Sequence, residues 1–251
     1  MSRLDALRIK IFTDGCSLPA MRKMAADPRI RGFTTNPTLM KAAGVTDYEG
    51  FAREALAVVT DRPISFEVLS DEFDEMERQA RLISQWGVNV NVKIPITNGR
   101  GETAIPLVRR LATDGIRVNV TAVMTLEQVS QATAALADGP HSFVSIFAGR
   151  IADTGRDPIP TIVAAVEIMR AHPRIETIWA SPRELLNLFQ ADAAGCHVIT
   201  MTPELLSKLD LVDKDLERFS LETVCMFRDD AARAGLRLPS RDARLGPPSK
   251  D

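Results

Sequence analysis

The chain has 251 residues, enough for one large domain or two small ones with a substantial hydrophobic core. Its hydrophobic content of 45%, charged content of 25% and net charge of −2 are ordinary for a globular protein and give no support for nucleic-acid or membrane binding. No apolar run approaches the length of a membrane span, and the first residues lack the hydrophobic stretch of a signal peptide.

The cysteines and histidines indicate neither disulfides nor a bound metal. Cys16, Cys196 and Cys225 are far apart, and their odd number argues against a disulfide framework. The histidines are dispersed, so we expect no zinc site. We therefore predict a cytoplasmic protein with reduced thiols.

Short runs rich in β-forming residues recur roughly every 25 to 30 residues and are separated by segments with helical periodicity. The predicted strands are 8–13, 32–35, 63–68, 88–94, 116–122, 142–148, 175–180 and 196–201. The segment 71–87 illustrates the helices, because Phe73, Met76, Ala80 and Ile83 share one stripe and Gly87 follows the last turn.

Eight strands that alternate with helices predict an α/β fold, a (β/α)8 TIM barrel. An open doubly wound sheet is the structural alternative, but no GxGxxG or GxxxxGK[ST] motif follows a strand. We predict that 1–210 form the barrel and 211–238 a C-terminal helical extension, with a helix near 215–235 that covers the barrel or mediates subunit contact. We expect 239–251 to be a flexible tail.

The alternation of residues in 88–96 predicts which side chains face the barrel interior. The valines and isoleucines share one parity and should pack against helices, whereas Asn89, Asn91 and Lys93 share the other. Lys93 then lies near the carboxyl end of its strand, where barrel active sites are built.

Four other strands also place polar or ionisable groups inside, mostly near their carboxyl ends. These groups include Asp14, Ser65, Glu67, Asn119, Thr121 and Ser145. Barrel interiors are usually filled by branched aliphatic residues, so five converging polar strands indicate a functional site.

Each of these residues also has a purely structural interpretation. Lys93 could reach the barrel mouth or pair with Glu67 or Asp14, and the buried asparagines could hydrogen-bond one another. Asp14 could be a turn or cap residue, and Asn36 could cap a helix whose first turn contains Pro37.

The chemical interpretation is that a desolvated lysine amine attacks a carbonyl and forms a Schiff base. Asp14 and Glu67 are carboxylates placed to transfer the protons that this chemistry requires. Arg150, with Ser181 as a helix cap and Arg183 beside the free amides, is typical of a phosphate clamp. Ion pairs of the arginines with Asp153 or Glu184 are the alternative.

Residues 9–195 resemble the transaldolases, class I Schiff-base aldolases of the pentose phosphate pathway. The resemblance is carried by strings that occur in the family's order: FTDG, TTNPT (34–38), SFEV, VNVKIPIT, VNVTAV, SIFAGRIAD and ASPRE. It implies that Lys93 is the Schiff-base lysine, that Asp14 handles the C4-hydroxyl proton, and that Glu67 works through a catalytic water.

The resemblance also implies the remaining site residues and the partners. Thr121 would hold the catalytic water, and the substrate would contact Thr35, Asn36, Asn119, Ser145, Phe147, Arg150, Ser181 and Arg183. It implies sugar-phosphate substrates, no metal and no cofactor, and a homo-oligomer that is a dimer, pentamer or decamer.

Two positions bear on the reaction. The similar fructose-6-phosphate aldolases carry Gln and Tyr where this chain has Glu67 and Phe147, which favours transfer of a dihydroxyacetone unit from a ketose phosphate to an aldose phosphate. Ile146 and Pro182 depart from the family's usual proline and aromatic residue, and leave room for a modified, for instance sulfonated, ketose. Simple aldol cleavage and a silent sugar-phosphate-binding barrel remain alternatives, and a pyridoxal-phosphate barrel is a weaker one because TTNPT does not fit it.

Overall fold

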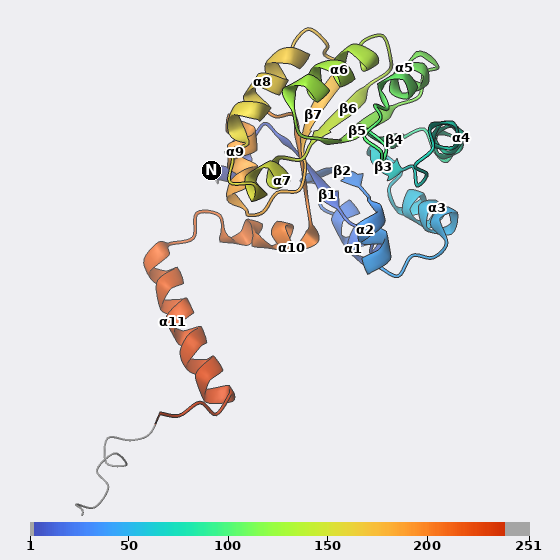
Figure 1. Cartoon of the computed structure of the whole chain (residues 1–251). Coiled ribbons are helices and arrows are strands. Elements are labelled where there is room, and N and C mark those ends of the chain that lie inside the picture. Colours follow the sequence, from blue (N-terminus) through green and yellow to red (C-terminus); the bar gives the residue numbers. More distant parts are fainter. Residues whose placement is uncertain (1–2, 239–251) are drawn as a thin grey trace, which may run out of the picture. The chain divides into compact units, whose positions relative to one another are not determined.

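A computed structural model describes residues 3–238 and contains a closed barrel of eight parallel strands in sequential order (Figure 1). The strands are β1 (Lys10–Asp14), β2 (Ile30–Thr34), β3 (Ile64–Glu67), β4 (Val90–Pro95), β5 (Val118–Val123), β6 (Ser142–Ile146), β7 (Ile175–Trp179) and β8 (Val198–Met201). The predicted (β/α)8 barrel with an additional C-terminal helix is confirmed.

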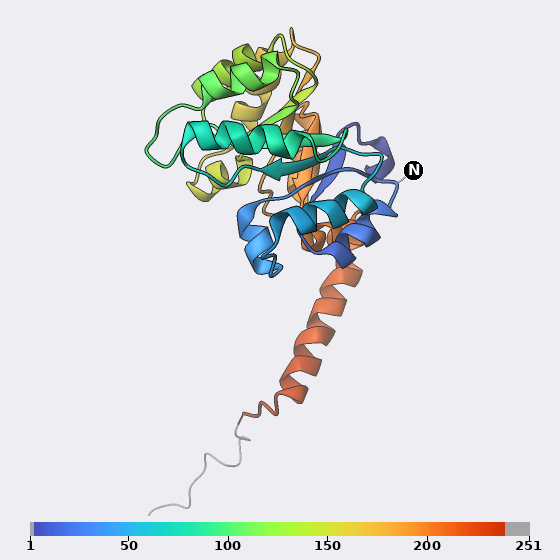
Figure 2. The same cartoon turned by 90° about the vertical axis from the view of Figure 1, so that its right-hand side faces the viewer.

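Helices follow the strands and surround the sheet, as the two perpendicular views show (Figures 1 and 2). They are α1 (Leu18–Ala25), α2 (Pro37–Ala42), α3 (Tyr48–Val58), α4 (Phe73–Ser84), α5 (Ile105–Thr113), α6 (Leu126–Leu136), α7 (Ala148–Asp153), α8 (Ile159–Met169), α9 (Leu186–Ala193) and α10 (Pro203–Leu206). Short 3-10 helices lie at Arg3–Ala6 and Ser207–Leu211, and α11 (Leu216–Arg233) is the last helix of the described chain.

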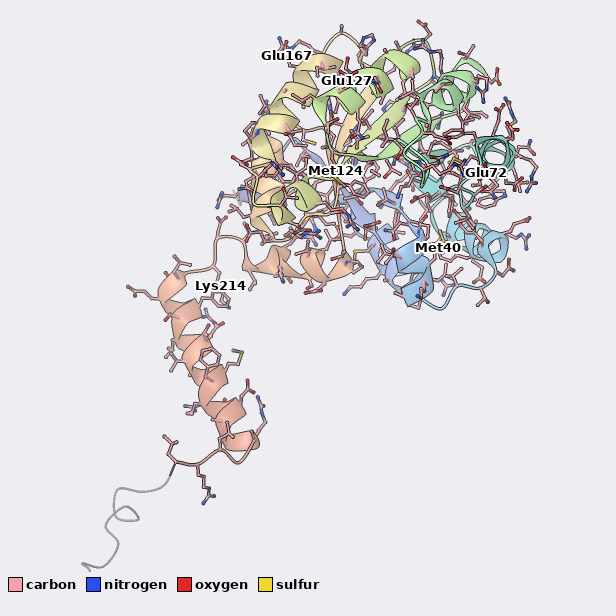
Figure 3. All side chains as sticks on the ribbon, in the orientation of Figure 1. Met40, Glu72, Met124, Glu127, Glu167 and Lys214 are labelled. Carbon is pink, nitrogen blue, oxygen red and sulfur yellow. The ribbon has the colours of Figure 1, made fainter. Side chains whose placement is uncertain are left out.

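The helix α4 shows how sequence periodicity becomes packing. Its predicted stripe faces inward, with Met76, Ala80 and Ile83 buried and Phe73 half-buried. Its polar face is exposed, and acidic residues such as Glu72, Glu127 and Glu167 lie on the outer surface of the barrel unit (Figure 3).

Two hydrophobic clusters confirm the predicted strand parity. Val90, Val92, Ile94 and Ile96 belong to the large cluster that the strands form with the helices. Val88 was expected to pack there too, but it lies before the first residue of β4 and is 91% exposed. A separate small cluster of opposite parity fills the barrel interior and consists of Phe12, Phe143, Ile178 and Val198. The barrel therefore has an apolar plug beneath its polar carboxyl end.

Asn89 was expected inside the barrel with Lys93, and it lines a cavity with Asn91 at the amino end of the barrel, away from Lys93. It lies before the first residue of β4, and its side-chain amide donates to the carbonyls of Val59 and Arg62, both at 2.8 Å. The backbone carbonyls of the loop before β3 attract this amide, so Asn89 ties that loop to the start of β4.

The contacts divide the chain into a barrel unit, Arg3–Asp210, and a unit that begins at Leu211. In the described part of the second unit, α11 has no buried residue. The predicted tail, 239–251, lies outside the described residues. Between residues 3 and 238, no helix is both long and apolar enough to cross a bilayer.

Candidate active site

A cavity of ≈440 Å³ lies at the carboxyl ends of the strands. Its lining includes Asp14 from β1, Glu67 from β3, Lys93 from β4, Thr121 from β5 and Ser145 from β6. All five predicted strands therefore bring a polar side chain to one place. Because the strands are parallel, their carboxyl ends meet at this single face of the barrel.

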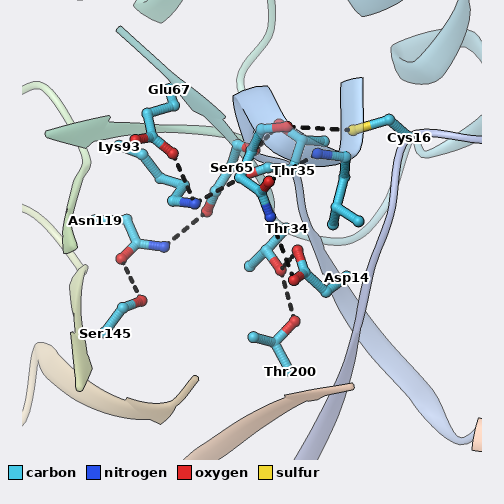
Figure 4. A network of polar contacts seen from close by, with 12 residues as sticks. Asp14, Cys16, Thr34, Thr35, Ser65, Glu67, Lys93, Asn119, Ser145 and Thr200 are labelled. Carbon is cyan, nitrogen blue, oxygen red and sulfur yellow. Dashed lines mark hydrogen bonds and ion pairs between the residues drawn. The ribbon is translucent and has the colours of Figure 1, made fainter. Parts of the chain in front are cut away.

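Lys93 is the most enclosed charged side chain of this cavity, with 5% of the residue exposed. Its ammonium nitrogen lies 3.0 Å from Oε2 of Glu67 and donates to the carbonyl oxygen of Thr35 at 2.8 Å (Figure 4). The register of β3 with β4 places Glu67 directly beside Lys93. The predicted ion pair thus exists, and it holds the nitrogen at the cavity floor.

Asp14 lies in the same cavity and is held by neutral partners. Its Oδ1 accepts a hydrogen bond from the Thr34 hydroxyl at 2.8 Å, and its Oδ2 lies 3.5 Å from Nδ2 of Asn36 (Figure 4). Burial raises the pKa of Asp14 above its ordinary value, although the Lys93 charge acts in the opposite direction. Asp14 is thereby suited to exchange a proton with a bound molecule.

Asn119 lies beneath the cavity and is fully buried. Its Nδ2 donates to the hydroxyl of Ser65 at 3.1 Å, and its Oδ1 accepts from the hydroxyl of Ser145 at 2.7 Å. The three side chains link β3, β5 and β6. This network orients Ser145 toward the cavity. The purely structural interpretation had the buried asparagines bonded to one another, but the partners of Asn119 are serines.

Thr35 and Thr121 occupy different environments. The Thr35 hydroxyl donates to the backbone carbonyl of Ser65 at 2.8 Å, and Thr35 does not line the cavity; its contribution is the carbonyl that receives Lys93. Thr121 does line the cavity, and its Oγ1 is buried without a hydrogen-bond partner among residues 3–238. That hydroxyl is available to a small polar molecule.

Asn36 both caps a helix and lines the cavity. Its Oδ1 accepts from the backbone N–H of Leu39 at 2.9 Å and caps α2, whose first residue is Pro37. The cap fixes the side chain so that its Nδ2 faces Asp14. The cap prediction is confirmed.

The rim of the cavity carries Phe147, Arg150, Ser181 and Arg183. Arg150 is exposed, lies 5.9 Å above the centre of the Phe147 ring, and has no ion pair in the described part of the chain. Arg183 forms a bidentate ion pair with Asp153, as the structural alternative predicted, and this pair lowers the pKa of Asp153.

Ser181 does not cap a helix, and this prediction is wrong. Its φ of 58° is left-handed, and α9 begins only at Leu186. The side chain of Asn187 accepts from the backbone N–H groups of Arg183 and Glu184, at 2.7 and 3.2 Å. These N–H groups are therefore already satisfied, and they are not the free amides of a helix N-terminus.

Two residues that line the cavity were not predicted from the sequence. Thr200 on β8 lines the cavity, and its hydroxyl lies 2.6 Å from that of Thr34, which in turn holds Asp14. Both threonines have inward parity, so extending the alternation rule to β2 and β8 would have found them. Ala122, whose φ of 61° is left-handed, also lines the cavity and has no comparable sequence signal.

Within residues 3–238, no group of three or more histidine, cysteine, aspartate or glutamate side chains is arranged to hold a metal ion. The fold and the site together define a (β/α)8-barrel protein with a buried lysine, a carboxylate paired with it and a second carboxylate in the same cavity, at the carboxyl face of its strands.

The chain belongs to the transaldolase/fructose-6-phosphate aldolase family, whose model matches residues 11–238. It is 34% identical over 215 residues to a Listeria monocytogenes protein named "Probable transaldolase 2", covering 84% of this chain and 94% of that one. A Thermoanaerobacter protein named "Probable transaldolase" is 32% identical over 234 residues, which cover 92% of this chain and all of the relative.

A solved structure adds evidence on the fold alone. The crystal structure of a lyase/mutase candidate from Burkholderia cenocepacia J2315 superposes with a TM-score of 0.56 at 14% identity, covering 93% of this chain and 89% of that one.

Proposed function

We propose that this protein is a transaldolase that moves a dihydroxyacetone unit from a ketose phosphate to an aldose phosphate through a Schiff base on Lys93. The observation that carries the proposal is the position of the Lys93 nitrogen at the floor of the cavity, 3.0 Å from Glu67, with Asp14 in the same cavity. Membership of the transaldolase/fructose-6-phosphate aldolase family supports it.

The proposed reaction begins when the amine of Lys93, after giving up a proton, attacks the C2 carbonyl of the ketose phosphate. Glu67, which lies beside that nitrogen, accepts this proton and returns it to the carbinolamine hydroxyl, which leaves as water and gives the iminium ion. Asp14 then accepts the C4-hydroxyl proton, the C3–C4 bond breaks, and its electron pair moves into the iminium.

The products of that cleavage are a free aldose phosphate and an enamine on Lys93. The enamine attacks the carbonyl carbon of an acceptor aldose phosphate, whose oxygen regains a proton from Asp14. Water then adds to the new iminium and releases the product ketose and the free amine. The raised pKa of Asp14 supports this assignment, because the carboxyl must both accept and return a proton.

The other predicted residues have proposed roles that follow from their positions. Arg150 and Arg183 stand at the rim, where guanidinium groups bind a phosphate well. Ser145 and Asn36 face the cavity and would bind substrate hydroxyls, and Asn119 would act from beneath, through Ser145. The unpartnered hydroxyl of Thr121 would hold the water that Glu67 uses.

Phe147 and Glu67 favour transfer over simple cleavage. Phe147 lines the cavity and has no hydroxyl that could help to protonate the enamine at carbon or help water to attack the iminium ion that this protonation gives. The intermediate would then persist until an acceptor aldehyde arrives. Fructose 6-phosphate and sedoheptulose 7-phosphate are the proposed donors; a modified ketose, including a sulfonated one, is the alternative that Ile146 and Pro182 leave open.

Borohydride trapping tests the proposal. Incubation with fructose 6-phosphate and borohydride should leave a reduced adduct with the mass of one dihydroxyacetone unit on Lys93, located by peptide mass spectrometry. Lys93→Ala should give no adduct, and Lys23→Ala, at an exposed position of α1, should behave like the wild type. Absence of an adduct with every ketose phosphate would leave a silent sugar-phosphate-binding barrel as the better description.

Adding erythrose 4-phosphate separates transfer from cleavage. Transfer predicts a product that depends on the acceptor, with little free dihydroxyacetone. Release of dihydroxyacetone at the same rate without an acceptor would instead identify an aldolase.

We further propose that the protein is a cytoplasmic homo-oligomer. The three free cysteines support a reducing compartment, since Cys16 and Cys196 are buried and none is paired. The exposed apolar side chains of α11, among them Leu221, Val224 and Phe227, support association with other copies.

A further inference from the structure

A second and larger cavity, of ≈590 Å³, lies at the opposite, amino end of the barrel strands. Lys10 begins β1, Arg31 lies on β2, Arg117 directly precedes β5 and Phe143 lies on β6, and all four line this cavity. It shares no lining residue with the candidate active site. Neither the proposed reaction nor the family resemblance accounts for it.

The charges around this cavity do not balance. The two acidic residues in its lining are paired, because Glu176 accepts from Lys10 at 2.5 Å and Asp61 lies 3.4 Å from Arg62. Arg31 and Arg117 have no carboxylate partner within residues 3–238, and the only hydrogen bond of the Arg117 side chain goes to the backbone carbonyl of Val88. The mouth therefore presents two uncompensated guanidinium groups to an anion.

The inner part of the cavity contains a buried polar side chain without a partner. Asn91 is 1% exposed and lines the cavity, yet neither atom of its amide has a hydrogen-bond partner in the described part of the chain; its Oδ1 is fully buried. The buried Asn119 and the half-buried Asn89, by contrast, are both bonded. A buried amide that makes no protein hydrogen bond is costly unless another molecule satisfies it.

Two phenylalanine side chains also line the cavity. Phe12 and Phe143 pack edge to face with ring centres 5.7 Å apart and line the cavity from the apolar plug that separates it from the active site. His141 lies at the rim, 3.4 Å from Glu176. The cavity thus combines a cationic mouth, an inner amide that has no hydrogen-bond partner among residues 3–238, and an apolar floor.

We propose that this cavity is a binding site for a small phosphate monoester. Arg31 and Arg117 bind the phosphate, and Asn91 bonds a hydroxyl group of the organic part, which lies against Phe12 and Phe143. A dianionic phosphate matches two guanidinium groups that have no carboxylate partner among residues 3–238, and the cavity has the size of a small-molecule site rather than a macromolecular surface. The ion pair with Lys10 offsets the negative charge of Glu176 at this cavity.

The test uses glycerol 3-phosphate as the probe and isothermal titration calorimetry as the measurement. A Lys93→Ala, Arg150→Ala, Arg183→Ala background removes the other phosphate site, so that binding reports on the new one alone. The proposal predicts one site per chain in this background. Adding Arg31→Ala and Arg117→Ala should weaken binding at least about tenfold, the usual effect of removing charged hydrogen bonds.

Arg109→Ala is the matched control, because Arg109 is an exposed arginine on α5 that does not line the cavity. It should leave the affinity within about twofold, below the effect of even one typical hydrogen bond. Asn91→Leu should weaken glycerol 3-phosphate more than inorganic phosphate, since the latter has no hydroxylated body. Thermal unfolding followed by circular dichroism checks that each variant folds.

Two results would overturn the proposal: no binding in the triple-variant background, or affinity that is unchanged by Arg31→Ala and Arg117→Ala. Equal weakening of both probes by Asn91→Leu would remove Asn91 from the site. None of these measurements depends on catalysis, so they stand or fall independently of the proposed transaldolase reaction.

Discussion

At the scale of single residues, the decisive feature is that Lys93 is buried but not isolated. A buried ammonium group requires a nearby acceptor, and the structure supplies Glu67 and the carbonyl of Thr35. Asp14 lies in the same cavity but has only neutral hydrogen-bond partners. The two carboxylates therefore have different environments, which is the condition for different roles in proton transfer.

This difference predicts how stability depends on pH. The pKa of Asp14 is raised in the folded state, so its favourable contribution is complete below the ordinary carboxyl pKa and is lost as the pH rises through the raised value. Asp14→Asn removes that loss and keeps an oxygen for Thr34. The melting temperature of the variant, relative to wild type, should be higher at pH 8 than at pH 4, by about 2–4 °C per kcal/mol regained.

Differential scanning calorimetry at the two pH values measures this effect. Asp138→Asn, at an exposed position that follows α6, is the control and should show no such trend. If the difference between Asp14→Asn and wild type were the same at pH 4 and pH 8, Asp14 would not be a destabilised carboxylate. Activity should fall in the same variant, because Asn cannot accept the C4-hydroxyl proton.

At the scale of elements, the rim of the active site depends on the close approach of two loops. The backbone N–H of Gly149, in the first turn of α7, donates to the carbonyl of Ala180 at 3.3 Å. A methyl group on Gly149 would lie 1.6 Å from the carbonyl oxygen of Ser181. That oxygen belongs to the backbone, so only glycine permits the observed distance between α7 and the segment after β7.

Gly149→Ala should therefore push apart the segments that carry Arg150 and Arg183. We expect KM for a phosphorylated ketose to rise by about tenfold or more, in line with loss of charged hydrogen bonds. Trapping of unphosphorylated dihydroxyacetone on Lys93 should change much less. Steady-state kinetics and borohydride trapping measure the two effects.

The matched control is Ala152→Ser, which alters an exposed position of the same helix. Its KM should equal that of the wild type. An unchanged KM in Gly149→Ala would mean that the rim arginines do not bind the substrate phosphate.

At the scale of the whole molecule, α11 stands out because no described part of the chain buries its apolar side chains. It has 18 residues, none of them buried among the described residues, and it exposes large apolar side chains. These side chains are Leu216, Phe219, Leu221, Val224, Met226 and Phe227. A helix with this much exposed apolar surface is typical of an interface.

We predict that light scattering coupled to size-exclusion chromatography gives a mass that is a multiple of the 27.5 kDa chain. Replacing Val224 and Phe227 with glutamate should return the mass to that of one chain, because the new charges would be buried at the interface. Ser220→Glu, an exposed polar position of α11, should keep the multiple. A wild-type protein of single-chain mass would exclude the homo-oligomer.

Most strands and helices of the barrel could be predicted from the sequence, because their periodic patterns involve only neighbouring residues. The alternating apolar residues of 90–96 and the helical stripe of 73–83 depend only on the period of each element, and both are buried as predicted. The same rule placed Asp14, Glu67 and Lys93 inside, and the structure brings them into one cavity. Val88 departs from the rule, because it lies before the first residue of β4 and is exposed.

The sequence by itself determined the barrel and the facing of its strands, because periodicity and chain order are properties of neighbouring residues. Tertiary structure alone decided the partners: that Lys93 pairs with Glu67, that Asn187 occupies the amides near Ser181, and that Thr200 supports Asp14 through Thr34. The cavity at the amino end of the barrel is also decided only by the tertiary structure. Its residues are scattered along the chain, and only closure of the barrel brings them together.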